Sequence, residues 1–269
     1  QQTYVHISIG IFDNDSTDGT QQWIKQNSNR FRYVISPHNL GFSTAHNHLI
    51  QMFAPEAQDF YMCLNPDAVL DQNYINNLVI AAGQYQADWV TGKLLLSGNP
   101  DRVYSVGHGL RRDGFSFNIG YGLPDIYNED REVFGAAGAA ALYRPTMFPD
   151  MQLFDENIFL YYEDTDVDWR ARRQNLRCWY CANAIGWHRG GTLNEALRIQ
   201  SLGNRFYSII KNAYLFELLT VNLPIIILHI LARLILTPRA GWQLLWITLR
   251  KMPVALKKRY TPVISRSEM

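Results

Sequence analysis

The chain has 269 residues, of which 47% are hydrophobic, 18% charged and 13% aromatic, with a formal net charge of +1. This composition excludes a disordered or fibrous chain and allows one large α/β domain, or a domain of about 200 residues with an appendage. Residues 211–269 hold nine Lys/Arg and two acids, whereas the rest of the chain holds 16 Lys/Arg and 22 acids. The acidic body argues against nucleic acid as a partner, and the basic, apolar tail suggests contact with anionic lipid.

The first third of the chain alternates strand-like and helix-like segments. Strands that alternate with helices indicate parallel βαβ units in a doubly wound sheet flanked by helices. The predicted strands are residues 5–12, 32–36 and 59–64, and the predicted helices are residues 20–27, 43–53 and 73–86.

Two carboxylates follow strand ends in this region. Asp13 comes directly after the first predicted strand, and Asp67 stands in the turn Asn65-Pro66-Asp67. Proline cannot donate to a sheet ladder, so the third strand ends at this turn. Ligands of doubly wound sheets gather beyond the carboxyl ends of strands. We therefore expect Asp13 and Asp67 to face one crevice.

The middle of the chain contains two further strands and an acidic helix start. Residues 89–96 and 178–186 read as strands, and the second leads to His188. Residues 97–132 are polar and glycine-rich, which predicts a hairpin or a mobile loop. The small residues at 135–143 predict either a strand whose backbone another group can approach closely, or a surface on which a helix packs tightly. Acids at 163–168 precede arginines, as the dipole of a helix prefers.

The C-terminal part is helical and apolar. Residues 223–236 are strongly apolar, but His229 and Arg233 interrupt them, and the segment is shorter than the roughly 20 residues that span a bilayer. Residues 239–251 mix Trp, Leu and Arg, which is typical of interfacial helices. We predict a domain at 1–205 and an amphipathic membrane-interface appendage at 206–269. A helical cap docked on the body, or a contact in a homo-oligomer, is the alternative.

Five motifs, in one order, resemble those of family 2 glycosyltransferases. Residues 13–20 resemble the DNxSxDGT turn, and residues 39–47 resemble NxGxxxAxN. Residues 64–67, LNPD, are similar to a version of the metal-binding DxD motif. Residues 162–170 resemble xEDxDxxxR, and residues 188–192 resemble HxxGxS. The ordered set is specific and implies a GT-A-type mixed sheet, close to rhamnosyltransferase-like enzymes.

The resemblance implies a role for each of these motifs. Asp67 and His188 would hold Mn²⁺ or Mg²⁺, which can neutralise a sugar-diphosphate as its bond breaks. Asp164, with Glu163 as the fallback, would be the general base for the acceptor hydroxyl. Turn formation and helix capping are the local alternatives for these residues. The residues that would bind the sugar donor are Asp13, Asn14, Asn39, Gly41, Asn47, Asn65, Asp67 and Arg170.

One feature departs from the family. Its members begin with a strand that precedes the DN motif, whereas residues 1–3 here match the segment just before the second strand. We therefore expect the first strand of the family fold to lie outside this sequence, which puts nucleotide affinity in doubt. The LNPD motif also has one acid where the fuller metal motif has two or three.

These observations predict a metal-dependent, inverting hexosyltransferase. Its sugar donor would be dTDP-rhamnose or, failing that, a UDP-hexose, and its acceptor a lipid-linked or cell-surface glycan. We expect it at the cytoplasmic face of a bacterial inner membrane, held peripherally through residues 206–259.

We also considered three alternative functions, of which two are disfavoured. The first is an inactive scaffold that binds glycan or lipid. A dinucleotide-binding dehydrogenase is disfavoured because no GxGxxG follows an early strand. A polytopic polysaccharide synthase is disfavoured because no apolar segment looks long enough and the QxxRW signature is absent.

Overall fold

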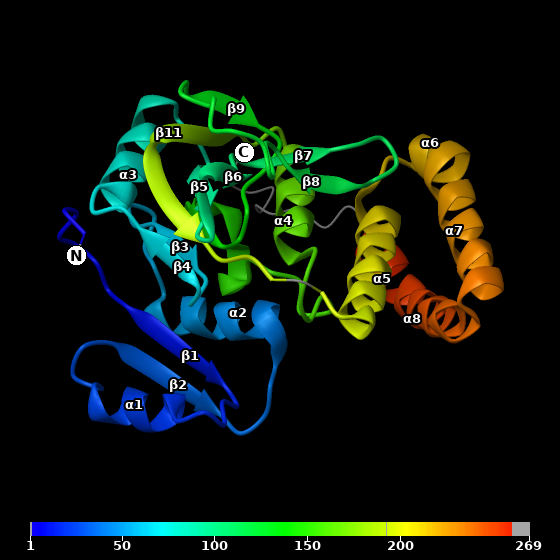
Figure 1. Cartoon of the computed structure of the whole chain (residues 1–269), viewed down its shortest axis with the longest axis horizontal. Helices are drawn as coiled ribbons and strands as arrows, with labels where there is room; N and C mark the ends of the chain where they lie inside the picture. Colours follow the sequence, from blue (N-terminus) through cyan, green and yellow to red (C-terminus); the bar gives the residue numbers. More distant parts are fainter. Residues whose placement is uncertain (1, 192, 260–269) are drawn as a thin grey trace.

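A computed structural model describes residues 2–191 and 193–259 (Figure 1). The strands are β1 (Gly10–Asn14), β2 (Arg32–Ser36), β3 (Tyr61–Leu64), β4 (Ala68–Leu70), β5 (Trp89–Leu96), β6 (Asn99–Ser105), β7 (His108–Leu110), β8 (Ser116–Asn118), β9 (Arg131–Val133), β10 (Ala140–Tyr143) and β11 (Cys178–His188). The α-helices are α1 (Thr20–Gln26), α2 (Gly41–Phe53), α3 (Tyr74–Gln84), α4 (Glu163–Arg172), α5 (Glu195–Asn212), α6 (Leu215–Glu217), α7 (Leu223–Leu236) and α8 (Pro238–Lys257). Short helical turns η1 (Pro145–Met147), η2 (Pro149–Met151) and η3 (Leu218–Asn222) connect them.

A seven-stranded mixed sheet forms the centre of the protein. Its order is β3-β10-β5-β11-β4, with β6 paired to β5 and β9 paired to β11. Strands β5 and β11 run parallel and are mostly buried, because helices and the β6–β9 region cover their two faces. The antiparallel pairing of β11 with β4 sets His188 opposite Ala68, the residue after Asp67. The predicted α/β fold with a central mixed sheet is confirmed.

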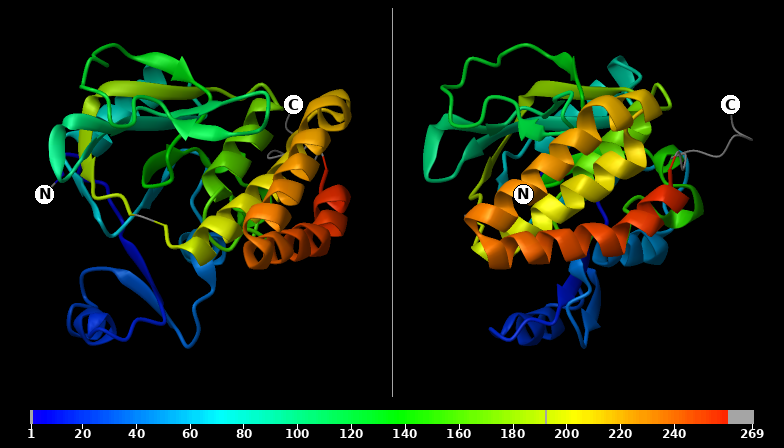
Figure 2. Two further views of the ribbon diagram at one scale, coloured as in Figure 1. Left: turned by 45° about the vertical axis from the view of Figure 1, so that its right-hand side comes forward. Right: turned by 90° about the vertical axis from the view of Figure 1, so that its right-hand side faces the viewer.

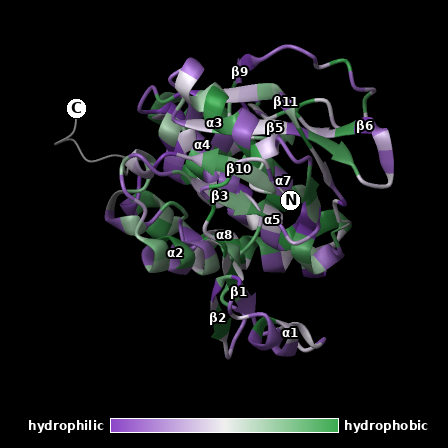
Figure 3. Ribbon diagram, turned by 90° about the vertical axis from the view of Figure 1, so that its left-hand side faces the viewer, coloured by the Kyte–Doolittle hydropathy of each residue, from purple (hydrophilic) through white to green (hydrophobic). Residues whose placement is uncertain are grey.

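The first two strands form a separate parallel pair. Figure 3 shows β1, β2 and α1 standing apart from the main body, and no strand of the described residues joins this pair to the large sheet. The pair rests on α2, where a Cβ on Gly10 would lie 2.5 Å from the ring of Phe53. The sequence predicted a strand at 5–12, but the observed strand is 10–14. Val5 and Ile9 are exposed because no described strand pairs with residues 5–9.

The segment 97–132, predicted to be a hairpin or a mobile loop, is built of short strands. It contains β6 and the β7–β8 hairpin, and β9 begins at Arg131. The small residues that follow include β10, which lies between β3 and β5 in the sheet. This part of the chain therefore covers the end of the sheet near α4 (Figure 1).

The C-terminal helices pack as a layer of their own. Figure 2 shows α5, α7 and α8 side by side, and their shared core includes Phe206, Ile230 and Leu244. The expected boundary at residue 205 falls inside α5, which starts at Glu195. The first helix of this layer thus begins before residue 206, where the sequence analysis placed the start of the appendage.

One helix of this layer is longer than the sequence indicated. The turn η3 joins α6 to α7, so that Leu215–Leu236 forms a 22-residue helix with a mean hydropathy of 2.1 and only 22% of its most apolar window buried. By length and composition it can cross a membrane. The expectation that no segment has sufficient apolar length is therefore wrong.

Candidate functional site

The turn after β3 and the end of β11 bring two polar side chains together. His188 Nε2 lies 3.0 Å from Asp67 Oδ1, and Asn65 Nδ2 lies 3.4 Å from the same nitrogen. The imidazole is buried, whereas the Asp67 side chain is 40% exposed. Residues 121 positions apart in the chain therefore meet at one solvent-facing edge of the sheet, as the sequence predicted for this pair.

Tyr104 of β6 connects this pair to the start of α4. Its ring packs edge-on against His188, with ring centroids 4.4 Å apart. Burial raises the pKa of Tyr104 to about 12, and the negative charges of Asp164 and Asp67 add to the effect. Asn65 N–H donates to Ala139 O at 2.9 Å, and the neighbouring Gly138 N–H donates to Asp164 Oδ2 at 3.1 Å, so the turn that carries Asp67 and the start of α4 lie in one region of the protein.

The two acids at the start of α4 differ in environment. Tyr161 and Tyr162 both adopt positive φ, of 69° and 75°, and this sharp turn leads into Glu163. The Glu163 side chain is buried, and its Oε2 makes no hydrogen bond among the described residues. Asp164 keeps 22% of its side chain exposed. Of the two, only Asp164 is accessible to a substrate.

Backbone amides fix the Asp164 carboxylate. Gly138 N–H donates to Oδ2 at 3.1 Å, and Thr165 N–H donates to Oδ1 at 2.7 Å. Burial and the nearby Asp164 charge raise the pKa of Glu163 to about 8. Glu163 is thus mainly protonated at neutral pH, beside a carboxylate that hydrogen bonds hold in place. A buried acid with a raised pKa beside a partly exposed carboxylate is typical of acid–base sites.

Asp13, Asn14 and the loop before α2 form a second polar group. Asp13 Oδ1 accepts hydrogen bonds from Ser16 N–H and Gln21 Nε2, while its buried Oδ2 has no partner among the described residues. Asn14 Nδ2 donates to Gly41 O at 3.0 Å. None of these bonds reaches the Asp67–His188 pair. These hydrogen bonds therefore do not link Asp13 to Asp67, although we expected both carboxylates to face one crevice.

The loop before α2 depends on a glycine. Asn14 Oδ1 accepts from Leu40 N–H, and Asn39 Oδ1 accepts from Gly41 N–H. Gly41 has a φ of +81°, and a Cβ there would lie 2.4 Å from Phe159 O. Gly41 lets this loop contact the segment that leads to α4. Asn39 and Gly41 thus shape the loop, and Asn14 attaches it to β1.

Two expected residues lie in the interior instead. Asn47 is 1% exposed and uses its amide on Phe154 O and N–H and on the Glu156 carboxylate. Arg170 is 7% exposed and donates to Asp166 Oδ2 and Leu153 O. Their polar atoms are occupied within the protein, so both residues hold the 153–156 segment. The hydrogen bonds give both residues a structural role, and their contact with the sugar donor stays an untested prediction.

Sequence reasoning missed Tyr104 and His108. His108 of β7 lies 2.8 Å from Asp168 Oδ2 through Nδ1. Both residues come from the segment read as a hairpin or loop, where no motif marks them. One signal was available, because Asp168 follows Asp164 by four residues and must share its helix face.

The donor atoms at Asp67 and His188 fit a divalent cation as a partial ligand set. Among residues 2–191 and 193–259, no group of three or more His, Cys, Asp or Glu side chains is arranged to hold a metal ion. The Asp67 oxygen and His188 Nε2 nevertheless converge, and a carboxylate with an imidazole suits Mn²⁺. A metal here would need its other ligands from a bound phosphate and water.

Comparisons with known proteins give a consistent result. The sequence model for "Glycosyl transferase family 2" matches residues 1–151. An N-acetylglucosaminyl-diphospho-decaprenol L-rhamnosyltransferase of Mycobacterium tuberculosis is 28% identical over 184 residues, covering 60% of this chain and 59% of that protein. The low-salt glycan biosynthesis hexosyltransferase Agl10 of Haloferax volcanii is 25% identical over 175 residues. The match covers 64% of this chain and 55% of that protein. The chain therefore spans less than two thirds of these relatives.

Solved structures share the fold. A mannosyltransferase from Pyrobaculum calidifontis, in complex with GDP-Man and Mn²⁺, has a TM-score of 0.53 at 14% identity and covers 97% of this chain and 70% of that one. GalNAc-T7 with UDP, GalNAc and Mn²⁺ has a TM-score of 0.57 at 11% identity. The match covers 76% of this chain and 41% of that one. The fold is that of the GT-A glycosyltransferases. Since the family model covers more than half of the chain, the protein belongs to glycosyl transferase family 2.

Proposed function

We propose that this protein transfers a sugar from a nucleotide-diphosphate donor to a glycan acceptor, with inversion at the anomeric carbon. The observation that carries the proposal is the meeting of Asp67 and His188, 3.0 Å apart, in the region that Tyr104 shares with Asp164. A pair of side chains that can hold a divalent cation and an accessible carboxylate are the two features that such a transfer needs. Membership of family 2 supports the same reaction.

Asp67 and His188 would hold Mn²⁺ or Mg²⁺ together with the donor diphosphate. The ion would supply positive charge that stabilises the nucleotide diphosphate as it leaves. Pro66 limits the motion of the turn, so that Asp67 is in place before the donor binds. Asn65 lies against His188 and would help to keep the imidazole oriented. Asp13 and Asn14 would bind the nucleotide base, since Asp13 Oδ2 is buried without a partner among the described residues.

Asp164 would act as the general base. Its carboxylate takes the proton of the acceptor hydroxyl as that oxygen attacks the anomeric carbon, and the bond to the diphosphate breaks with its electron pair on the leaving oxygen. Glu163 remains the fallback, but burial and its raised pKa make it a poorer base at neutral pH. One displacement of this kind inverts the anomeric centre without a covalent intermediate.

We propose dTDP-rhamnose as the sugar donor, with a UDP-hexose as the second choice. Support comes from the rhamnosyltransferase and hexosyltransferase relatives. The acceptor would be a lipid-linked or polysaccharide glycan, because the mycobacterial relative is named for a decaprenol-linked substrate. We place the protein at the cytoplasmic face of a bacterial inner membrane.

The C-terminal helices would provide the membrane contact. Leu228, Ile235 and Leu236 of α7 are all more than half exposed, as are Trp242 and Trp246 of α8. Apolar and indole side chains in such numbers on a helical layer favour a lipid surface. We propose that residues 206–259 rest on the membrane.

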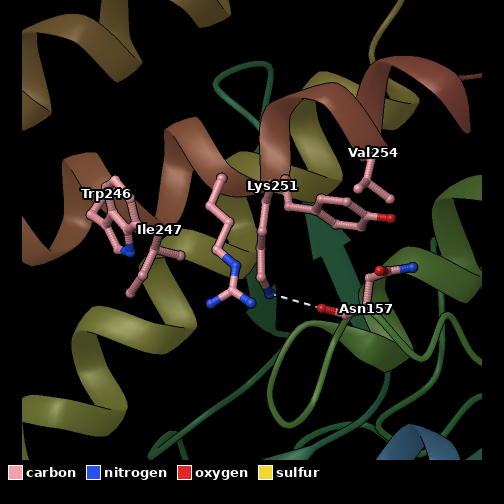
Figure 4. Close-up of a pocket in the computed structure, with 7 residues that line it drawn as sticks. Asn157, Trp246, Ile247, Lys251 and Val254 are labelled. Atoms are coloured by element: carbon pink, nitrogen blue, oxygen red, sulfur yellow. Dashed lines mark hydrogen bonds between the residues drawn. The ribbon is translucent and has the colours of Figure 1, made fainter.

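A hollow of about 410 Å³ lies along α8, next to this apolar surface (Figure 4). Trp246, Arg250 and Lys251 line it, and no acid does. Lys251 donates to Asn157 O at 2.8 Å, and Arg250 lines the same hollow. These cations beside an exposed indole would attract a lipid phosphate to this part of the surface.

A catalytically inactive scaffold is the second candidate. The separation of β1 and β2 from the main sheet favours it, because Asp13 is then not joined to the Asp67–His188 pair. A scaffold of this kind would bind glycan or lipid without releasing nucleotide diphosphate.

The two candidates are separated by a screen of UDP-, dTDP- and GDP-sugars with Mn²⁺, read by thermal shift and by nucleotide diphosphate release. The transferase proposal expects one nucleotide class to raise the unfolding midpoint and to be turned over, with both effects lost in Asp67→Ala. Asp101→Asn, at an exposed position of β6, serves as a control and should behave as the wild type. Binding without turnover would support the scaffold, and an unchanged response in Asp67→Ala would overturn the metal-site assignment.

A further inference from the structure

A buried histidine outside the family motifs lies between two carboxylates of α4. His108 is 5% exposed, and its Nδ1 lies 2.8 Å from Asp168 Oδ2. Its Nε2 lies 3.7 Å from Asp164 Oδ2. Asp164 and Asp168 are one helical turn apart, so the imidazole bridges them on the same face of α4.

The far end of this bridge is rigid. Asp168 is fully buried, and its Oδ1 accepts hydrogen bonds from Trp89 Nε1 at 3.0 Å and Ala136 N–H at 3.1 Å. A Cβ on Gly135 would lie 1.9 Å from the Asp168 carboxyl group, so this close approach requires glycine. His108 N–H also donates to Gly135 O at 2.8 Å. Backbone and side chain together hold the imidazole in one orientation.

The bridge carries a positive charge at neutral pH. Burial disfavours the imidazolium, but the negative charges of Asp164 and Asp168 outweigh burial and raise the pKa of His108 to about 9. Asn118 of β8 adds a hydrogen bond that acts in the same direction. Glu163, the other titratable group of α4 that senses His108, is mainly protonated near neutral pH. The imidazolium therefore acts chiefly on Asp164 and Asp168.

We propose that His108 is a positioning residue for Asp164, an inference that rests on the proposed role of Asp164 as base: held by Asp168, the ring fixes the orientation of the Asp164 carboxylate and places a positive charge beside it.

His108 need not transfer a proton in this arrangement. Gly138 and Thr165 N–H groups already hold the two oxygens of Asp164, and His108 Nε2 lies beside Oδ2 at 3.7 Å. When Asp164 takes the acceptor proton, His108 stays protonated and paired with Asp168. As the pH rises through about 9, His108 loses its charge and Asp164 loses this support.

The test compares two variants that keep different halves of the bridge. His108→Asn places an amide near the position of Nδ1, so it can keep the bond to Asp168 but cannot reach Asp164. His108→Gln extends toward the position of Nε2 and remains near Asp164 without a charge. His46→Asn is the matched control, because His46 is a partly buried histidine of α2 whose Nδ1 meets Tyr61 Oη instead. Sugar-transfer rates are measured from pH 5 to 10 for each variant.

We expect His108→Asn to lower kcat by about 10- to 100-fold, because a misplaced catalytic group costs this much, while the KM for the sugar donor changes little. The wild-type rate should decline near pH 9, where His108 loses its proton, and this decline should be absent in both His108 variants. His46→Asn should keep the wild-type profile. A purely structural role for His108 would leave the shape of the profile unchanged.

A second measurement covers the case in which a variant fails to fold. The imidazole ¹⁵N shifts of wild-type His108 should titrate near pH 9, and at lower pH in Asp164→Asn. If His108→Asn keeps the wild-type profile, or the titration is the same in Asp164→Asn, the inference is wrong while the proposed function stands. If Asp164→Asn itself keeps full activity, the proposed function fails and the inference fails with it.

Discussion

Two acidic regions include residues of α4, Glu163 and Asp164 in the first and Asp166 in the second, and they are built differently. In the first, Asp164 is partly exposed and Glu163 Oε2 is buried without a partner among the described residues. In the second, Lys211 donates to both Asp155 Oδ2 and Asp166 Oδ2, at 2.7 and 2.8 Å. The second region is a closed network, whereas the first leaves polar atoms available.

This difference shows how one acidic motif serves two purposes. Buried charges are stable only when they are paired, and Asp166 has three partners, Lys211, Arg170 and Asn212. The network ties α4 to α5, and Lys258 of the tail also donates to Asp155. In the other region the partly exposed Asp164 carboxylate keeps acceptor capacity that a substrate hydroxyl would use. The network therefore fixes the helix whose first turn carries the proposed chemistry.

The largest expected effect is the loss of kcat when Asp164, in the first region, is replaced. Asp164→Asn should lower kcat by about 10²–10⁴-fold, since general-base catalysis contributes this much, without lowering the unfolding midpoint. Asp101→Asn, at an exposed position of β6, is the control. Steady-state transfer assays and thermal unfolding measure both. A larger loss in Glu163→Gln than in Asp164→Asn would exchange the roles of the two acids.

Breaking the closed network should instead destabilise the protein. Lys211→Met leaves two buried carboxylates short of a cation, and removing one partner of a buried ion pair typically costs about 3–5 kcal/mol. We expect a clearly lower midpoint in thermal or urea unfolding. Lys257→Met, an exposed change on α8, should have little effect. Equal midpoints for the two variants would show that the network does not stabilise the fold.

The pH dependence of stability sharpens the comparison. The pKa of Glu163 is raised from its ordinary value to about 8, so the folded protein prefers the protonated acid and loses stability as the pH rises from about 4.5 to about 8. His108, with a pKa raised to about 9, adds stability below about pH 6.5 that is lost as the pH rises through 9.

Glu163→Gln removes the first of these titrations. As the pH rises from 5 to 8, the unfolding midpoint of Glu163→Gln should therefore increase relative to that of the wild type. The increase should be about 2–4 °C for each kcal/mol of relieved destabilisation. Midpoints measured at intervals of one pH unit test this. A constant difference between the two proteins across that range would mean that Glu163 is ionised in the folded state.

The smallest expected effect concerns the tail. Arg250→Ala should weaken binding to vesicles of anionic lipid about fivefold, because one cation near such a surface contributes about 1 kcal/mol. Trp246→Ala should also weaken binding, including to neutral vesicles. Trp23→Ala is the control, since Trp23 is half exposed on α1. Sedimentation with vesicles measures all three, and equal losses in all would argue against a specific membrane face.

The residues that local chemistry marks were predicted well from the sequence. Pro66 ends a strand and fixes Asp67 in a turn, and the strand before His188 is long and apolar, so both residues had to lie at strand ends. The acids before the arginines likewise marked the start of α4. These features depend on neighbours in the chain, which a sequence displays directly.

Features that depend on distant partners were not predicted. The amide of Asn47 donates to Phe154 O, and the guanidinium of Arg170 donates to Asp166 and to Leu153 O. No local sequence pattern indicates such contacts. The pairing of β1 with β2 alone depends on which strand edges meet. The long apolar helix was missed because the apolar segment was counted from residue 223, with His229 and Arg233 as interruptions, whereas η3 extends the helix before Leu223.

The most direct test of the account is an anomalous difference map of the protein crystallised with Mn²⁺ and the nucleotide diphosphate that the screen selects. The account predicts a manganese peak about 2.1 Å from an Asp67 oxygen and about the same distance from His188 Nε2, with diphosphate oxygens completing the coordination. Asp164 should face the same space. A nucleotide-bound ion that contacts neither Asp67 nor His188 would contradict the account.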